Sequence, residues 1–164
     1  MFIVNNLWYC SDKFSFFLKK QKISWLFLCV IHIFNVKQRV LDKAKQIALS
    51  LCPTNREIRN SHIAFLIESS TIQKIGTNKK RTHPVTKSHP YHDGIVGIHA
   101  ELDCLLKMDK EDLSDYTMLV MRVDNNGKLN MSKPCKGCQS LLQQFNIKEV
   151  WYSDSKGQIV KHIW

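Results

Sequence analysis

The chain has 164 residues, of which 44% are hydrophobic and 23% are charged, proportions that are ordinary for a soluble globular protein. This length predicts a single domain that is large enough to bury a sizeable core. The formal net charge of +10 could attract phosphate groups, but the lysines are scattered and form no long run. The charge therefore favours a solvated basic surface over a dedicated nucleic-acid track.

The six cysteines do not have the pattern of a disulfide framework. Two of them form a Cys-x-x-Cys pair, and the other four lie in apolar or helical settings (Cys10, Cys29, Cys52 and Cys104). Because such usage suits a reducing compartment, we expect a cytoplasmic protein.

Residues 1–36 differ in composition from the rest of the chain. Their apolar run over 23–36 is shorter than the roughly 20 residues that a membrane-spanning helix needs. No small-residue cleavage site follows it, which argues against a signal peptide. We expect an N-terminal extension without stable membrane insertion. It is either a docking or membrane-touching piece, or upstream sequence translated from a misassigned start.

From residue 37 the pattern becomes regular. Apolar residues at helical spacing predict a helix that closes at Cys52-Pro53. Alternating apolar residues then predict strands over 63–67 and 72–75, joined as a hairpin by a turn at Ser69-Ser70.

The second predicted strand ends at Gly76, which is followed by Thr77 and Asn78. The glycine allows a sharp turn, and the Asn78 amide can both donate and accept hydrogen bonds. Without further context, a plain Asx turn explains this segment equally well. Residues 79–98 then form a long loop, which we interpret as a substrate-covering loop. The alternative is a second metal site, formed by three histidines at irregular spacing (His83, His89 and His92).

The remaining elements complete an α-β-β-α-β-α-β-β order. The pattern predicts helices over 101–108 and 135–145, and strands over 116–123, 149–152 and 158–163. Residues 128–133 are expected to carry the chain back to the two cysteines. This order predicts three helices packed against a mixed five-stranded sheet with a C-terminal β-hairpin.

The strongest chemical signal is His99-Ala100-Glu101, followed later by Pro134-Cys135-Lys136-Gly137-Cys138. A catalytic zinc site needs three nitrogen or thiolate ligands and one open position, and His99, Cys135 and Cys138 supply that set. Glu101 lies two residues beyond the histidine, where its carboxylate can move protons without binding the metal. The alternative is a closed structural zinc site or merely buried cysteines. A structural site usually has a fourth Cys or His ligand, and none is evident.

The H-A-E…P-C-x-x-C pattern resembles the signature of base deaminases. Together with the element order, it makes residues 37–164 similar to the cytidine and deoxycytidylate deaminase superfamily. The resemblance implies a three-layer α/β fold with helices on both faces of the sheet. It also implies a zinc cofactor held by His99, Cys135 and Cys138, with Glu101 as the proton shuttle. The substrate contacts that it implies are Asn78, Ala100 and Pro134.

The resemblance also bears on substrate and partners. A C-terminal hairpin is similar to that of the free-nucleoside cytidine deaminases. However, Gln139 stands where an arginine often follows the second zinc cysteine, and the usual Phe-x-Val-Gly-Ala segment is missing. We expect hydrolytic deamination of cytidine, deoxycytidine, CMP or dCMP by a homo-oligomer. The alternatives are a deaminase that acts on a base within RNA or single-stranded DNA, and a non-catalytic zinc-stabilised interaction module.

Overall fold

The computed structural model describes residues 37–51, 61–81, 83–84 and 97–164. The chain divides into two compact units, Met1–Arg39 and Val40–Trp164, and the fold described below is that of the second unit. The predicted extension over 1–36 and the predicted helix end at Cys52-Pro53 lie outside the described residues. Within the described ranges, no helix has the length and apolarity that crossing a membrane would require.

Two strands joined by a tight turn form one side of the sheet. β1 (Ser61–Glu68) pairs antiparallel with β2 (Thr71–Thr77), and the last pair of residues in register is Glu68 with Thr71. Ser69 and Ser70 both adopt positive φ angles, 45° and 68°, as the two central residues of a type I′ hairpin turn require. The predicted hairpin is therefore confirmed, although glycine and asparagine are the usual residues of such a turn.

The described sheet has the order β2-β1-β3-β5-β6, and β4 pairs with β3 beside this path. The remaining strands are β3 (Tyr116–Val123), β4 (Leu129–Asn130), β5 (Glu149–Ser153) and β6 (Ile159–Lys161). Strands β3 and β5 run parallel, and every other described pair is antiparallel. The sheet is thus mixed, with the C-terminal β5–β6 hairpin that the sequence predicted.

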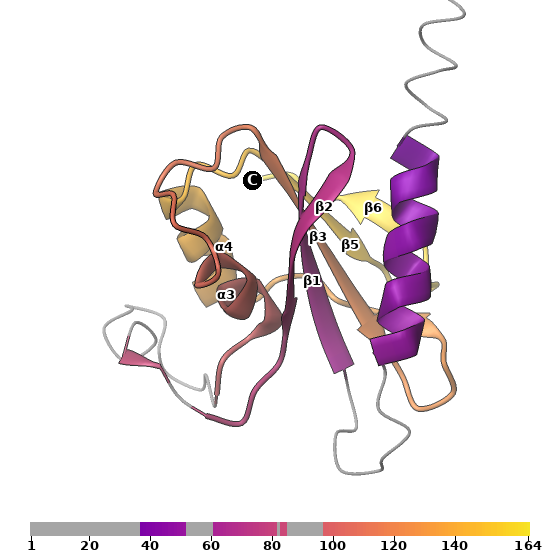
Figure 1. The fold of residues 1–164 in the computed structure, drawn as a ribbon. Coiled ribbons are helices and arrows are strands. Elements are labelled where there is room, and N and C mark those ends of the chain that lie inside the picture. The colour runs from indigo at the N-terminus through magenta and orange to yellow at the C-terminus, as the bar shows by residue number, and fades with distance from the viewer. Residues whose placement is uncertain (1–36, 52–60, 82, 85–96) are drawn as a thin grey trace, which may run out of the picture. The chain divides into compact units, whose positions relative to one another are not determined.

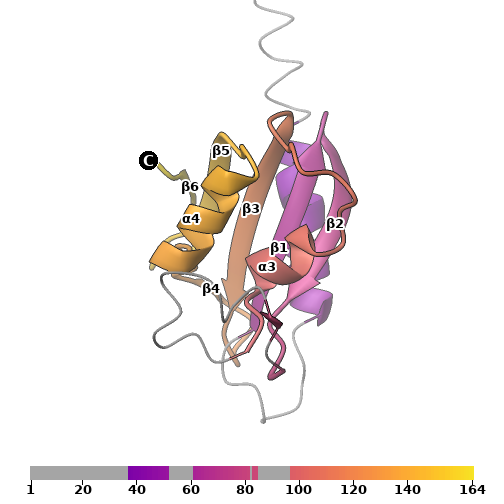
Figure 2. The same ribbon diagram turned by 90° about the vertical axis from the view of Figure 1, so that its left-hand side faces the viewer.

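Helices cover both faces of this sheet (Figure 1). α3 (Ala100–Leu105) and α4 (Lys136–Gln144) lie on one face, where Figure 2 shows them in front of the strands. Residues 40–51 are helical and pack on the opposite face through Ala44 and Ala48. β1 sends alternate side chains to the two layers. Ala64 and Leu66 belong to the α3/α4 side, whereas Ile63 and Phe65 pack with the other helix.

The predicted fold class is confirmed, with two corrections. The described sheet has six strands instead of five, because the segment expected to be a simple return contains the two-residue strand β4. The helix predicted over 101–108, α3, ends at Leu105. There, Lys107 and Met108 donate to carbonyls three residues back, Cys104 and Leu105, so the last turn tightens and the helix stops.

Candidate metal centre

His99 is positioned by the chain on both of its sides. On the N-terminal side, Lys79 and Ile98 form an antiparallel bridge with two backbone hydrogen bonds of 2.9 Å. On the C-terminal side, His99 is the N-cap residue of α3, with extended backbone angles, and its carbonyl accepts the Asp103 N–H. The imidazole therefore projects from a fixed junction between the end of β2 and the start of α3.

The two cysteines are held by the first turn of α4. Cys135 is the N-cap, and its Sγ accepts the backbone N–H of Cys138 at 3.5 Å. Just before them, the Pro134 carbonyl accepts a 2.6 Å hydrogen bond from the Gln139 side chain. The sequence predicted that the helix begins with Cys135, whereas in the structure Cys135 is the N-cap that precedes the first helical residue. Gln139, noted only as a departure from the arginine pattern, fastens the Pro-Cys segment to the helix.

These segments bring the three predicted ligands together. The Nδ1 atom of His99 lies 3.4 Å from Cys138 Sγ and 3.6 Å from Cys135 Sγ. Among the described residues, these three form the group that could hold a metal ion, with all ligand atoms within 4.8 Å of one another. A tetrahedral zinc ion, with bonds of about 2.0 Å to nitrogen and 2.3 Å to sulfur, would separate its N and S ligands by about 3.5 Å. The donor types and their spacing therefore fit zinc.

The surroundings shift the pKa values of the two cysteines in opposite directions. The pKa of Cys135 is lowered to about 4, mainly by its hydrogen bond with Cys138 and then by the one with His99, against the effect of burial. The hydrogen bond to Cys135 raises the pKa of His99. The pKa of Cys138 is raised, first by the bond to Cys135 and then by burial. A bound divalent cation would favour deprotonation of this second thiol as well.

Glu101 is buried beside these ligands. Only 5% of the residue is exposed, and burial raises the pKa of its carboxyl group even though the charge of His99 opposes the shift. The carboxyl group interacts with the Cys138 thiol through a side-chain hydrogen bond. A buried carboxyl group that touches a ligand set is suited to proton transfer at neutral pH.

The three predicted substrate contacts lie around this centre, in different settings. The Asn78 side chain is exposed, and its Oδ1 accepts the Ala100 N–H at 2.9 Å. This bond ties the end of β2 to the first residue of α3. Ala100 and Pro134 are both buried. The structure thus gives Asn78 a positioning contact, whereas its contact with a substrate remains a prediction.

Sequence reasoning missed His62, which lies at the start of β1. Its Nδ1 is 3.5 Å from the Asn78 side-chain nitrogen, so a neutral imidazole can accept from that amide. Burial lowers the pKa of His62 to about 4, and the positive charges of Arg122 and His99 add to the effect. No sequence signal marked this histidine, because it is a single polar residue at the end of an apolar strand.

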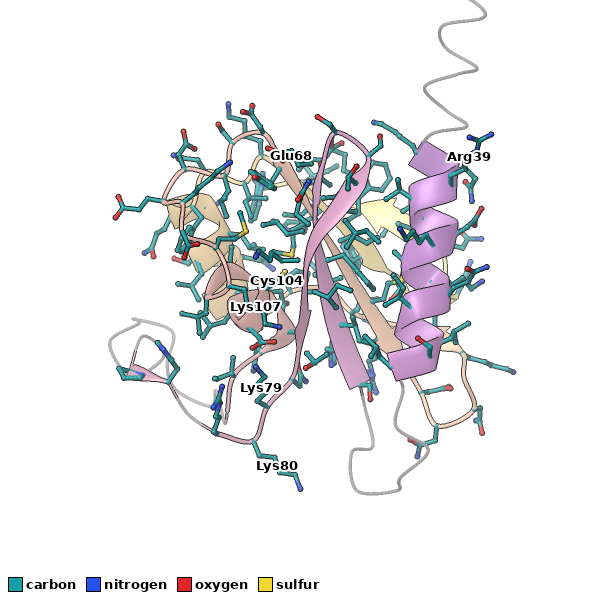
Figure 3. All side chains as sticks on the ribbon, in the orientation of Figure 1. Arg39, Glu68, Lys79, Lys80, Cys104 and Lys107 are labelled. Carbon is teal, nitrogen blue, oxygen red and sulfur yellow. The ribbon has the colours of Figure 1, made fainter. Side chains whose placement is uncertain are left out.

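A second missed feature is an ion-pair group around the buried Asp103. Its carboxylate accepts the Thr77 N–H at 3.1 Å and pairs with the ammonium groups of Lys79 and Lys107. Figure 3 labels these two lysines. Lys107 also donates to the Ile75 carbonyl at 2.6 Å. The group fastens the end of β2 onto α3. Only the i, i+4 spacing of Asp103 and Lys107 could have been read from the sequence.

The suggested histidine cluster in the 79–98 loop stays untested. Of its three members, His89 and His92 lie outside the described residues, and His83 takes part in no described metal-binding group. The interpretation of this loop as a cover for the substrate likewise concerns residues that are mostly outside the described ranges.

Comparison with known proteins gives similarity at the level of structure only. No protein-family model and no curated protein matches the sequence. The structure is similar to the crystal structure of dCMP deaminase from the cyanophage S-TIM5 in apo form. The two share 15% identity over 74% of this chain and 84% of that chain, with a TM-score of 0.47. It is also similar to the same phage enzyme in complex with dCMP and dUMP, with 18% identity over 72% and 81% of the two chains and a TM-score of 0.46.

Proposed function

We propose that this chain is a zinc-dependent hydrolase that deaminates a cytosine-type nucleoside or nucleotide to its uracil form and releases ammonia. The observation that carries the proposal is the buried Glu101 carboxyl group beside a group of three metal-binding side chains. A structural zinc site is closed by four protein ligands and has no use for a neighbouring acid. Three ligands leave one position for a water molecule, which is the arrangement of a catalytic site.

The metal would be held by His99, Cys135 and Cys138. When bound, zinc would supply Lewis acidity that brings the pKa of a water molecule close to neutrality. The chain's own contribution is to keep the three donors in place through the two helix starts. Because the donors lie on segments that are fixed by backbone hydrogen bonds, little reorganisation is needed when the ion enters.

Glu101 would move the protons of the reaction. Its carboxylate accepts a proton from the water whose oxygen bonds to C4 of the base, and passes that proton to the ring nitrogen N3. It then takes the remaining proton of the added hydroxyl group and gives it to the amino group. The C4–N bond breaks, ammonia leaves and a C4 carbonyl remains. The raised pKa of Glu101 suits a group that must both accept and donate in each cycle.

Asn78, Ala100 and Pro134 are proposed to contact the substrate. Asn78 uses one lone pair of its carbonyl oxygen on the Ala100 N–H and one amide hydrogen toward His62, so a second lone pair and the other amide hydrogen remain for a ligand. His62 accepts from the same amide, which orients it. We therefore assign the recognition of the nucleoside to the end of β2 and the start of α3.

A second candidate function is deamination of a base within a polynucleotide. The observation that favours it is a set of exposed cations next in sequence to the site residues. Lys80 and Arg81 follow Asn78, and Lys133 and Lys136 lie on either side of Pro134-Cys135. Such cations would attract either the single phosphate of a nucleotide or the backbone of a nucleic acid.

The test is ammonia release by the purified, zinc-loaded chain with cytidine, deoxycytidine, CMP, dCMP and single-stranded oligonucleotides. The decisive variant is Glu101→Gln, with Glu111→Gln, an exposed glutamate, as the matched control. We expect Glu101→Gln to keep zinc and to lose about 10²–10⁴-fold in turnover, the usual contribution of a positioned acid–base group. Full activity of Glu101→Gln would refute the mechanism. Turnover only on oligonucleotides would establish the second candidate instead.

A further inference from the structure

The segment that leads to the cysteines (residues 129–135, here the cysteine segment) passes through an opening in the sheet, where β3 and β5 cease to pair with each other. One edge of β3 pairs with β1 along its whole length, and the other edge changes partner part of the way along. The residues up to Val120 pair with β5, and those from Arg122 onward pair with β4. The chain that follows β4 then turns to the other side and bonds to β5, because the Ser132 N–H donates to the carbonyl of Ser153, the last residue of β5, at 2.8 Å. Residues 129–132 therefore lie between two strands that are direct neighbours elsewhere.

Such an opening leaves backbone groups without their partners in the sheet, and two serine hydroxyls supply the missing hydrogen bonds. Ser132 Oγ donates to the Val120 carbonyl at 2.8 Å and accepts the Ser153 N–H at 2.9 Å. Ser153 Oγ donates to the Asn130 carbonyl at 2.6 Å and accepts the Arg122 N–H at 3.3 Å. The two hydroxyl oxygens lie 2.8 Å apart.

The serine pair is shielded from solvent, with 1% of Ser132 and none of Ser153 exposed. Water therefore has no access to replace a lost hydroxyl group, and a buried backbone group left without a partner would force the chain to move. The segment that would shift is the one that continues through Lys133 and Pro134 to Cys135, and its remaining restraints are the Gln139 bond to the Pro134 carbonyl and the N-cap of α4. The other two candidate ligands are held by different contacts. His99 is held by the bond between its neighbour Ala100 and Asn78, and Cys138 is held as a residue of α4.

From this arrangement we propose that Ser132 and Ser153 are positioning residues of the metal centre, which set Cys135 at its distance from His99. The inference rests on the proposed zinc site, and it adds two residues that no part of the sequence motif contains. Neither serine touches the metal ligands. They act by fixing the backbone three residues ahead of Cys135, which adds a second restraint on a donor that the N-terminus of α4 holds from the other side.

The experiment compares Ser132→Ala and Ser153→Ala in the full chain with Phe65→Leu. Phe65 is equally buried but packs in the core on the opposite face of the sheet, so this control loses stability while the hydrogen bonds of the serine pair stay intact. Zinc affinity is measured by competition with a chromophoric chelator, well below the unfolding temperature of each variant. The absorption spectrum of the cobalt-substituted protein reports the geometry of the ligands.

We expect each serine variant to bind zinc about 10–100-fold more weakly, the range found when supporting contacts of metal ligands are removed. We also expect altered cobalt bands, whereas Phe65→Leu should keep the affinity and spectrum of the unmodified chain. The inference is overturned if the serine variants lose stability but bind zinc with the original affinity and spectrum. If the unmodified chain binds no zinc, the proposed function fails first. The two failures are therefore distinguishable, and because Ser132 and Ser153 make different bonds, either variant alone decides the question.

Discussion

In the ion-pair group around Asp103, we expect replacement of the two lysines and replacement of the aspartate to cost different amounts of stability. The Asp103 side chain is 5% exposed, whereas those of Lys79 and Lys107 are 32% and 42% exposed. If both lysines become methionine, a buried carboxylate is left with one hydrogen-bond donor, the Thr77 N–H. If Asp103 becomes asparagine, that N–H keeps its acceptor and water hydrates the two ammonium groups. We expect the double lysine variant to be much the less stable.

The magnitudes follow from what each change leaves behind. Removal of the partners of a buried charge costs about 3–5 kcal/mol. The Asp103→Asn change weakens hydrogen bonds to a charged group, which contribute from about 1.5 kcal/mol upward. Urea unfolding monitored by tryptophan fluorescence measures both free energies of unfolding. A double Lys128→Met, Lys156→Met variant removes the same charge from two exposed turn positions and serves as the control.

The two variants also differ in their dependence on pH. In the unmodified chain, burial alone would raise the pKa of Asp103, but the bonds to Lys79, Lys107 and Thr77 outweigh it and lower the pKa. Asp103 therefore stabilises the fold above the unfolded carboxyl pKa of about 3.9, and this stabilisation is lost as the pH falls through the folded pKa. Without the lysines, burial dominates and raises the folded pKa, so the carboxyl group destabilises the fold as the pH rises. The difference in the free energy of unfolding between the unmodified chain and the double lysine variant should grow from mildly acidic to neutral pH. Equal losses for Asp103→Asn and the double lysine variant, or a difference that does not vary with pH, would refute this reasoning.

Three further predictions concern the site and its support. Gly76→Ala should prevent stable folding, because a Cβ there would lie 2.0 Å from the Ala100 carbonyl oxygen and 2.6 Å from the Cys104 backbone nitrogen; thermal unfolding followed by circular dichroism checks this. Cys135→Ala should lose zinc, as measured by metal analysis after dialysis, and retention of one zinc per chain would contradict the ligand assignment. Removal of residues 1–36 should leave zinc binding and turnover intact, and failure of the shortened chain to fold would show that the extension belongs to the core.

The order of elements was predictable because it follows from local patterns. The alternation in β1 and the continuous apolar run of β3 each reflect burial on two faces, and both strands are in place. The three metal ligands were also predictable, since the chemistry requires particular residue types at particular spacings. The structure brings the two motifs together, with His99 Nδ1 lying 3.4–3.6 Å from the two sulfur atoms, while their role as metal ligands stays a prediction.

The features that were missed depend on contacts between distant segments. β4 has only two residues, too few for any periodicity. In the sequence, Ser132 is one polar residue of the return segment 128–133, and nothing nearby indicates that Ser153 lies beside it. Lys79 pairs with a carboxylate 24 positions away, and the burial that makes this pair matter exists only after β2 and α3 have packed.

The bridge between Lys79 and Ile98 has a consequence for how such a protein can diversify. It pairs the residue after Asn78 with the residue before His99, so the two ends of the segment between them are held together by the Lys79–Ile98 bridge. The entropy of closing a loop grows slowly with its length, by about 0.6 kcal/mol for each doubling. Insertions, deletions or a transplanted loop between residues 80 and 97 should therefore leave the metal ligands in register.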